Sequence, residues 1–429
     1  MNSDKTEPDN SPKPKAKSKL KNQITVVFDP GTSLSKILYV VNNGTVKWMT
    51  MGAEYLSLPT ESAEELPIDN GMGLPEDNAW VRQDKSGFCH AVGFVARNQL
   101  AKTSIKKLKH ESLMFKIMAG IGAIAKREKL GSSFNLELGV LLPLSEYRLE
   151  QDWSVELKSA LSSFYFQTQR FRVKLIDFLC MPEGYGIAMT AHRGNNAKKF
   201  KEGNTAIVML GYRNTSCLFL RRGTLGKPES GTTDLGFYTL LDKLIEKVPG
   251  LSREDILKAI KIDFEESYRR VNSNKTYFTY SENLATIDFL SLVKSNSPES
   301  IQFESSKIKN AYNTSLNEYW SLLKNWLEEI LPRTKEIDGF IFAGGSYDLL
   351  SNQLKKYASS LKASCSYTDA AEQLKKYLLW CNVTGKTRFM RENLALRFAD
   401  AWGFFVDFAE YDLDKILDRN TGEVITHGE

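Results

Sequence analysis

The sequence has few cysteines and histidines and no long apolar run. Its five cysteines are scattered and form no CxxC pair, which favours reduced packing residues over a disulfide framework. Its four histidines share no ligand-like spacing, so no zinc site is expected. No apolar stretch is long enough to cross a bilayer, and the first residues lack the apolar core of a secretory signal. These absences predict a cytoplasmic protein that does not enter a membrane.

The length and composition indicate a folded protein with a large core. The chain has 429 residues, of which 42% are hydrophobic and 25% are charged. These fractions are typical of globular proteins rather than disordered or fibrous ones. Chains of this length usually divide into two or more domains.

Most of the excess positive charge lies at residues 1–22. Six lysines against three acidic residues give this segment +3 of the total net charge of +5. With three prolines and almost no apolar side chains, it cannot offset the entropy cost of ordering, so we predict a disordered basic tail. It is open to two interpretations, a weak electrostatic tether to DNA or an acidic surface and a solubilising leader, of which the second is favoured.

The chain then opens with a predicted three-strand meander. Apolar, β-branched runs at 24–28, 36–41 and 45–49 predict strands. The turn Asp29-Pro-Gly-Thr-Ser33 joins the first two, and Asn43-Gly44 is a hairpin signal between the second and third. Helical spacing at 111–129 and from Ser145, and strand patterns at 137–142 and 171–178, complete an α/β domain.

This opening occurs a second time from residue 205. A strand runs into Gly211, a second strand follows, and Gly223 supplies the hairpin turn. Gly31 and Gly44 are thirteen positions apart, and Gly211 and Gly223 are twelve apart. A helix-like stretch from Asp234, an apolar periodic segment at 308–331 and a buried strand at 339–343 follow. The repeat predicts two pseudo-symmetric α/β halves whose Gly turns face each other.

Two facing Gly turns can act as a phosphate clamp. Backbone N–H groups in such turns can approach phosphate oxygens closely from both sides. Asp29, at the end of the first strand, suits a Mg²⁺ ion reached through its water shell, and we favour this role over turn capping. Ser33 and Lys36 are candidate phosphate donors.

These residues resemble the actin-like ATPases of the actin/Hsp70/sugar-kinase fold, and within them the bacterial plasmid-segregation proteins of the ParM (StbA) type. The resemblance covers most of residues 24–408. It implies two ribonuclease H-like domains around a nucleotide cleft, with ATP and Mg²⁺ as cofactors. Domain I would span 23–200, with a C-terminal helix at 393–410 returning to it, and domain II would span 201–392.

The resemblance also implies roles for individual residues. Glu183, in Met181-Pro-Glu183, is implied to orient and polarise the attacking water. The segments 231–238 and 398–404 are similar to the turn that opens the first helix of domain II and to the closing helix. The implied nucleotide-binding residues fall in three loops: Asp29, Gly31, Thr32, Ser33 and Lys36 in the first, Gly211, Asn214 and Thr215 in the second, and Gly344, Gly345 and Ser346 in the adenosine-contacting loop.

Several of these residues have a second interpretation. Glu183 could be a carboxylate at a helix N-terminus, favoured there by the helix dipole. Gly344 and Gly345 could form an ordinary turn from strand to helix. Asp234 is as well explained by helix capping as by ligand binding. Tyr212 and Arg213 have no assigned role.

One departure from the family pattern concerns the second loop. Aligning Gly211 with Gly31 places Met209 opposite Asp29, so the loop lacks the acidic residue that this family usually carries. Nucleotide binding is therefore more strongly predicted than hydrolysis. We expect slow hydrolysis and long-lived ATP filaments, and we expect Met209→Asp to raise turnover if the folded loop accepts it.

The leading hypothesis is a filament-forming ATPase that moves plasmid DNA through an adaptor protein, without direct sequence-specific binding to nucleic acid. Segments 52–110 and 251–310 lie where actin-like proteins carry the outer subdomains that form many filament contacts. Aromatic residues in the second segment suit either an interface or a small satellite core: Tyr268, Tyr277, Phe278 and Tyr280. A head-to-tail contact that does not close would give an open filament. The alternatives are a non-hydrolysing nucleotide-binding scaffold and a small-molecule kinase or phosphatase on the same fold.

Overall fold

The structure, a computed structural model, describes most of the chain. The described residues are 22–67, 73–84, 86–99, 110–147, 150–194, 197–261, 266–270, 276–280, 286–332, 336–380 and 394–410. The predicted tail at 1–22 therefore lies outside them except for Asn22. Within these ranges no helix is long and apolar enough to span a membrane.

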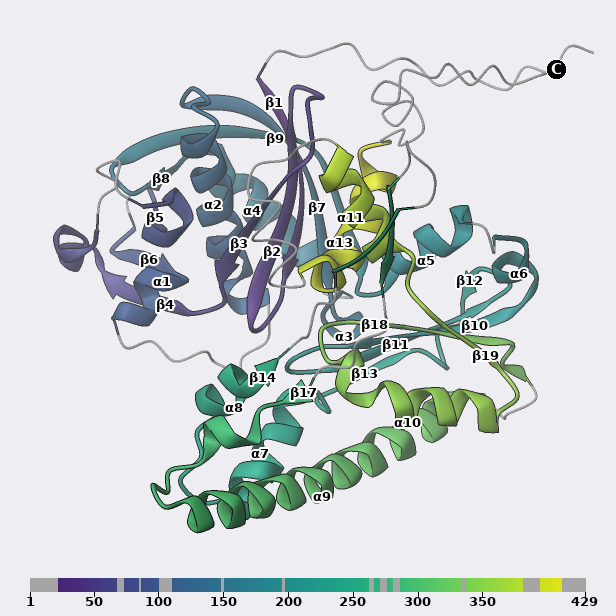
Figure 1. Cartoon of the computed structure of the whole chain (residues 1–429). Coiled ribbons are helices and arrows are strands. Elements are labelled where there is room, and N and C mark those ends of the chain that lie inside the picture. Colours follow the sequence, from purple (N-terminus) through teal and green to yellow (C-terminus); the bar gives the residue numbers. More distant parts are fainter. Residues whose placement is uncertain are drawn as a thin grey trace, which may run out of the picture.

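Domain I is built on one mixed sheet with the strand order β3-β2-β1-β7-β9-β8-β5-β6-β4 (Figure 1). The predicted meander is confirmed, because β1, β2 and β3 pair in antiparallel succession. The strands are β1 Gln23–Pro30, β2 Leu34–Val41, β3 Lys47–Gly52, β4 Tyr55–Pro59, β5 Trp80–Gln83, β6 Phe88–Val92, β7 Ser133–Leu142, β8 Phe164–Phe166 and β9 Gln169–Pro182. The helices are α1 Phe94–Asn98, α2 His110–Arg127, α3 Leu144–Tyr147, α4 Glu150–Ser162, α5 Tyr185–Arg193 and α6 Ala197–Glu202, with 3₁₀ turns at Thr60–Glu65 and Pro75–Asn78.

The sequence of β1 is a nearly continuous apolar run because the strand is buried on both faces. Ile24, Val26 and Phe28 pack with α2 in the core of domain I, whereas Val27 packs on the opposite face with the helices between the domains. Neighbouring side chains of a strand point to opposite faces. Asp29 therefore projects on the same face as Val27, toward domain II.

Domain II repeats the arrangement on a smaller sheet with the order β12-β11-β10-β18-β19, to which β13 adds beside β11. Its strands are β10 Asn204–Leu210, β11 Thr215–Arg221, β12 Thr224–Leu225, β13 Gly231–Thr233, β18 Gly339–Ala343 and β19 Ser364–Tyr367, and two short ribbons pair β14 Ile260–Lys261 with β17 Thr286–Ile287 and β15 Glu266–Arg270 with β16 Thr276–Tyr280. Its helices are α7 Phe237–Lys247, α8 Arg253–Ala259, α9 Pro298–Ile330, α10 Tyr347–Ser360 and α11 Ala370–Trp380, with a 3₁₀ turn at Phe289–Leu292.

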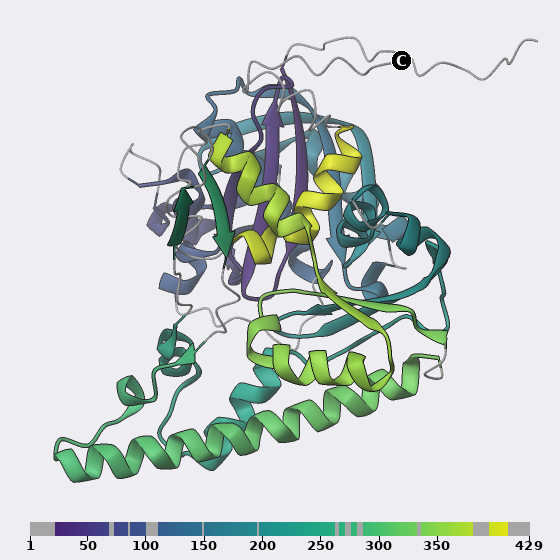
Figure 2. The ribbon, with the colours of Figure 1, turned by 45° about the vertical axis from the view of Figure 1, so that its right-hand side comes forward.

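The repeat predicted from the sequence is present in three dimensions. β1 pairs antiparallel with β2 and parallel with β7, and β10 pairs antiparallel with β11 and parallel with β18. Each domain thus presents one hairpin beside one parallel strand. Helix α9 is longer than the predicted segment and runs along the far side of domain II (Figure 2). The four aromatic residues that suit either an interface or a satellite core lie in β15 and β16, whose side chains are not described.

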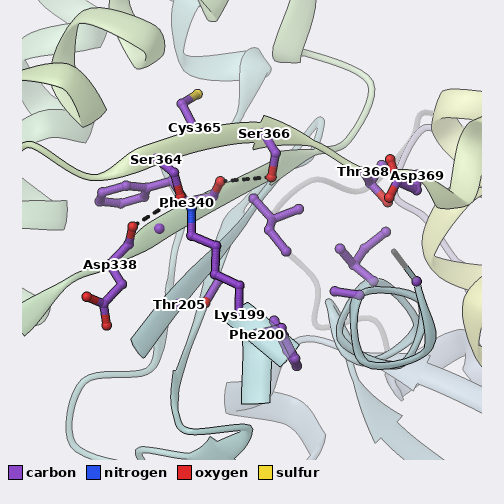
Figure 3. A pocket seen from close by; sticks show the side chains of 15 residues that line it. Lys199, Phe200, Thr205, Asp338, Phe340, Ser364, Cys365, Ser366, Thr368 and Asp369 are labelled. Atoms are coloured by element: carbon purple, nitrogen blue, oxygen red, sulfur yellow. Dashed lines mark hydrogen bonds between the residues drawn. The ribbon is translucent and has the colours of Figure 1, made fainter. Parts of the chain in front are cut away.

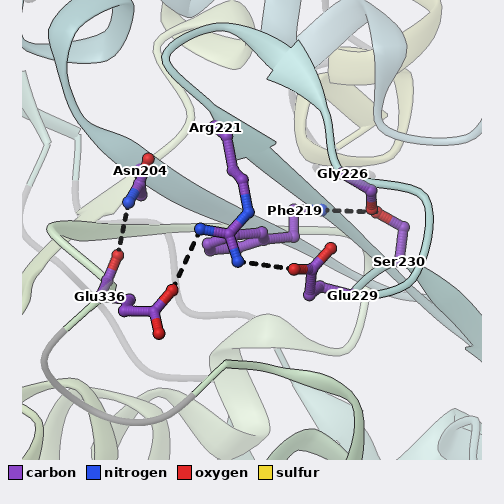
Figure 4. A network of polar contacts seen from close by, with 7 residues as sticks. All are labelled: Asn204, Phe219, Arg221, Gly226, Glu229, Ser230 and Glu336. Carbon is purple, nitrogen blue, oxygen red and sulfur yellow. Dashed lines mark hydrogen bonds and ion pairs between the residues drawn. The ribbon is translucent and has the colours of Figure 1, made fainter.

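The end of β11 farthest from its loop is fixed by a polar network (Figure 4). Arg221 donates to Glu229 at 2.6 Å and to Glu336 at 3.0 Å. Its guanidinium carbon lies 5.2 Å from the centre of the Phe219 ring. This network ties β11 to the segments that precede β13 and β18.

The last described helix, α13 Leu394–Phe408, joins the two domains. It contacts β1, β2 and β7 of domain I and crosses α5 and α11. At the crossing with α5 the backbones nearly touch, because a Cβ added to Gly186 would lie 1.8 Å from the carbonyl oxygen of Asp400, and one added to Gly403 would lie 2.0 Å from that of Gly186. Only glycine fits at these two positions, so α5 and α13 form a tight pair between the sheets.

Candidate nucleotide site

The first predicted loop is the turn between β1 and β2. Asp29 and Lys36 stand opposite each other in the hairpin and form an ion pair. The Asp29 residue is only 4% exposed, and its carbonyl oxygen accepts the N–H of Gly31 at 2.9 Å. Thr32 is half-buried, and Ser33 is exposed at the tip of the turn. The loop therefore presents a buried carboxylate below an accessible tip.

The second predicted loop joins β10 to β11 and rests on the start of α7. The Gly211 N–H donates to the carbonyl of Asn214 at 3.1 Å, which closes the turn. The carbonyls of Gly211 and Tyr212 accept the N–H groups of Phe237 and Tyr238 at 3.0 and 2.8 Å. These bonds satisfy amide groups at the helix N-terminus that have no partner within the helix. The loop is thus held in place by α7.

Two side chains of the second loop are buried in domain II. Asn214 is 6% exposed and Thr215 is fully buried. The Thr215 hydroxyl donates to the carbonyl of Leu235 at 2.7 Å. In this structure the Thr215 hydroxyl connects β11 to the segment before α7. Its predicted contact with a phosphate stays a prediction.

The third predicted loop, Gly344-Gly345-Ser346, follows β18. Gly344 has a φ of 98°, and a Cβ added there would lie 2.4 Å from the carbonyl oxygen of Leu210, so the position requires glycine. The Ser346 N–H donates to the same carbonyl at 3.3 Å. Gly345 is exposed. The second and third loops therefore lie side by side at one edge of the domain II sheet.

Glu183 connects domain I to the second hairpin. It follows β9 directly, is half-buried, and accepts the Ser216 hydroxyl of β11 at 3.1 Å. The same hydroxyl lies 3.2 Å from the Thr232 hydroxyl. Glu183 also stands one residue before Gly184, the N-cap of α5. Both interpretations of this carboxylate are thus compatible with its position.

Asp400 is a buried carboxylate that the sequence did not single out. It accepts the N–H of Gly184 at 2.7 Å and that of Ile187 at 3.2 Å. The pKa of Asp400 is raised to about 7, chiefly by burial and with smaller contributions from the charges of Asp29 and Glu183, while the bonds from Gly184 and Ile187 act to lower it. Three carboxylates from distant parts of the chain therefore influence one another at this place.

Arg213 belongs to the second loop and has a buried guanidinium. Its nitrogens lie 3.8 Å from Glu146 of domain I and 3.7 Å from Asp234. Asp234 does not cap the following helix, as one interpretation proposed, because Gly236 occupies the N-cap and the Asp234 side chain is 85% exposed. Gly236 packs against the backbone of Tyr212 and Arg213, where a Cβ would lie 2.2 Å from the carbonyl carbon of Arg213.

Arg397 of α13 lies between the first and third loops. Its Nη2 donates to the Ser33 hydroxyl at 2.8 Å. Its Cγ lies 3.6 Å from the place that a Cβ would occupy on Gly345. Sequence reasoning missed this residue, because no local motif marks an arginine that reaches loops of both domains.

Met209 lies in an apolar environment. It is half-buried and packs against the apolar cluster between the domains, to which Ile207 of the same strand face belongs. Its strand neighbours are Ser216 and Ala343. The position at which the family pattern predicts a second acid therefore carries a side chain that packs against apolar neighbours.

A cavity of about 280 Å³ lies away from these loops (Figure 3). It is lined by Thr205 and Gly339, at the beginnings of β10 and β18, and by Lys199 of α6. The predicted loops follow the opposite ends of the same strands. The cavity contains none of the predicted site residues and is separate from the candidate site.

A magnesium ion fits the residues present through Asp29. No group of three or more His, Cys, Asp or Glu side chains is placed to hold a metal within the described ranges. Mg²⁺ commonly takes one or two carboxylates and completes its shell with water and substrate phosphates. A single buried carboxylate at the first loop suits that kind of site and not an all-protein cage.

Comparisons with known proteins give the fold. No family model and no curated protein matches the sequence. Among solved structures, the actin-like protein Alp7A superposes with a TM-score of 0.58 at 13% identity, covering 94% of this chain and all of that one. The archaeal actin homologue Ta0583 in complex with ADP gives 0.51 at 14% identity, covering 91% and 100%. A subunit of a 15-stranded ParM filament from Clostridium botulinum gives 0.50 at 14% identity, covering 81% and 95%.

These likenesses cover between 81% and 94% of this chain and at least 95% of each solved structure. At such low identities they establish the arrangement of the chain and nothing about its activity. The expected fold class is confirmed: the chain has the actin-like fold, which it shares with proteins of the ParM type.

Proposed function

We propose that this protein is a filament-forming ATPase that binds Mg-ATP between its two domains. The observation that carries the proposal is the convergence of three loops from both domains, with Glu183 of domain I bonded to Ser216 of the second hairpin. The archaeal homologue of the same fold is an ADP complex, and the ParM relative is a filament. Both support nucleotide binding and self-association as proposals for this chain.

The proposed roles follow from the positions of the side chains. Backbone N–H groups of the first and second loops bind phosphate oxygens from opposite sides. Gly345 leaves room for the nucleoside beside the third loop. Mg²⁺, when bound, neutralises charge on the phosphate oxygens, and Asp29 would hold it on the side of domain I.

Glu183 is proposed to orient the attacking water. Its carboxylate lies beside β11 of the second hairpin and accepts a hydrogen bond from Ser216, which orients it. A water held by this carboxylate would lose a proton to it as the phosphoryl group departs. Because the residue belongs to domain I and its partner to domain II, its position depends on how the domains are placed relative to each other.

The wider biological role is an extension of this proposal. A nucleotide-controlled filament with the fold of ParM and Alp7A suits plasmid segregation through a DNA-bound adaptor in the cytoplasm. The basic tail at 1–22 would then add only weak electrostatic contacts.

Sedimentation with Mg-ATP, paired with phosphate release from the same sample, tests the proposal. We expect pelleting with Mg-ATP, weaker pelleting with ADP and slow phosphate release. Glu183→Ala should pellet normally but release phosphate about 10²-fold more slowly, the usual scale for a positioned acid-base group. Equal release by parent and variant would reduce Glu183 to a structural carboxylate. Failure to pellet under any nucleotide condition would contradict the filament proposal.

A non-hydrolysing scaffold is the second candidate, and the position of Met209 favours it. An apolar contact at this place leaves one fewer acid near the terminal phosphate. Pelleting with Mg-ATP that continues without any phosphate release would select this alternative.

A further inference from the structure

Two hydroxyl groups of domain II lie in series beside Glu183. The Ser216 hydroxyl donates to the Glu183 carboxylate at 3.1 Å, and it lies 3.2 Å from the Thr232 hydroxyl. A hydroxyl carries a single proton, and the proton of Ser216 is directed at the carboxylate. Thr232 is therefore the donor in the second bond. The order of donation is from Thr232 to Ser216 and from Ser216 to Glu183.

Strand pairing holds these two hydroxyls together. Ser216 of β11 and Thr232 of β13 stand directly opposite each other in an antiparallel pair, so their side chains lie on the same face. Leu218, two positions along β11, shares that face and packs in the apolar cluster between the domains. β13 also contacts α3 of domain I. The Ser216 residue is only 1% exposed. Both hydroxyls therefore lie at the boundary between the domains, and the Ser216 hydroxyl is shielded from water.

The two bonds connect domain II to the proposed catalytic carboxylate of domain I. Hydrogen bonds in a chain polarise and strengthen one another, so donation by Thr232 strengthens the bond from Ser216 to Glu183. Both distances are longer than about 2.8 Å, the usual separation of two hydrogen-bonded oxygens. Hydrogen bonds in catalytic sites often tighten when the substrate binds. The direction of the carboxylate is thus held from domain II, and only when β11 lies against the end of β9.

We propose that Thr232 is a positioning residue for ATP hydrolysis, which acts on Glu183 through Ser216 and makes the reaction depend on the placement of the two domains. The inference rests on the proposed function, in which Glu183 orients the attacking water. Segment 231–238 thereby gains a role in the reaction besides leading into α7. Neither hydroxyl contacts the nucleotide in this role, so removing either one should lower the rate of hydrolysis and leave nucleotide affinity unchanged.

Single-turnover phosphate release and ATP affinity, both measured on the full chain with Mg²⁺, test the inference. The proteins compared are the parent, Thr232→Val, Ser216→Ala and the double variant. We expect Ser216→Ala to slow release about 10- to 100-fold, the scale of a hydrogen bond to a charged group, and Thr232→Val about 2- to 10-fold, the scale of a neutral one. ATP affinity should change by less than about twofold.

The double variant separates a chain of hydroxyls from two independent effects. If Thr232 acts only through Ser216, the double variant should release phosphate as fast as Ser216→Ala alone. Thr232→Ser keeps the hydroxyl and should restore most of the parental rate. If Ser216→Ala does not fold, the comparison of Thr232→Val with Thr232→Ser still tests the inference, because equal rates in these two variants would contradict it.

Thr233→Val is the matched control, because it removes the hydroxyl of the next residue in β13, whose side chain points to the opposite face. It should leave release and affinity at parental values, and melting curves without nucleotide should show that each variant is folded. A parental rate in Thr232→Val would overturn the inference, as would an equal slowing by Thr232→Val with and without the Ser216 hydroxyl. If Glu183→Ala is slower than the parent, these outcomes leave the proposed function standing. A parent that releases no phosphate would overturn both.

Discussion

The carboxylate of Asp400 accepts the backbone N–H of Gly184 at 2.7 Å, across 216 positions of the sequence. A second bond, from Ile187 at 3.2 Å, completes a cap on the first turn of α5. Glu183 immediately precedes this turn. Helix α13 therefore fixes the backbone that carries the proposed catalytic carboxylate.

Replacing Asp400 should affect both stability and turnover. Asp400→Ala leaves two buried N–H groups without an acceptor, at a cost of about 1–3 kcal/mol for each in the free energy of unfolding. Phosphate release should also slow, because the backbone next to Glu183 is no longer held by the bond to Asp400. Asp400→Asn retains one acceptor oxygen and should lie between the parent and the alanine variant. Denaturant unfolding and phosphate release measure the two effects. A normal unfolding curve for Asp400→Ala would contradict the capping role.

The structure changes what is expected of Met209→Asp. The sequence alone allowed the aspartate to raise turnover, but the side chain packs against an apolar cluster, and Glu183 is bonded to the strand neighbour Ser216. A carboxylate there loses apolar contacts and gains no described cation. We expect a loss of about 1–3 kcal/mol in stability, with Met209→Leu near the parent value. Thermal melts measure this loss of stability. An unchanged melting temperature together with faster phosphate release would support the original expectation that the aspartate raises turnover.

Because of His90, the stability of domain I is expected to fall as the pH is lowered. Burial lowers its pKa from 6.5 to about 4. Its ring stacks 3.5 Å from that of Phe115 between centroids, and its Nδ1 lies 2.8 Å from the Tyr55 hydroxyl. The folded state holds the ring neutral, so its contribution is present above pH 6.5 and is lost as the pH falls toward 4. The loss approaches about 3 kcal/mol at the acid end.

Unfolding curves between these pH values check the sign of that effect. His90→Gln removes the titrating group, so its free energy of unfolding should fall less than that of the parent as the pH is lowered. Parallel pH profiles for parent and variant would show that His90 is not the group responsible.

The sequence predicts the two hairpins because these depend on local patterns, but it does not predict β4, β5, β6 and β8 of the larger sheet or β19 of the smaller one. Each hairpin is marked in the sequence by an apolar run that ends in a Gly turn. The repeat of this pattern indicates that the two hairpins occupy equivalent places in the two domains. Helix α9 begins at Pro298, earlier than its apolar periodicity suggests, because its first turns are exposed, as Phe303 is at 75%. Ser297 followed by proline is a helix-start signal that would have found this boundary.

The contacts made by single side chains across the fold could not be predicted in the same way. Asp400 stands in a segment already matched to the closing helix, but only the crossing of α5 and α13 turns it toward Gly184. Arg397 meets Ser33 from 364 positions away. From the sequence, Asp234 is as well explained by helix capping as by ligand binding, and only the structure shows that Gly236 is the N-cap of α7.

The central claim, that the first loop holds Mg-nucleotide, is tested most directly by ATP affinity with and without Mg²⁺ in the parent and in Asp29→Ala. The substitution removes a charge proposed to face the metal and little buried volume, and it releases Lys36 from its ion pair. We predict that Mg²⁺ strengthens binding to the parent and has little effect on the variant, while the variant still melts cooperatively. Equal enhancement by Mg²⁺ in both proteins would contradict the account.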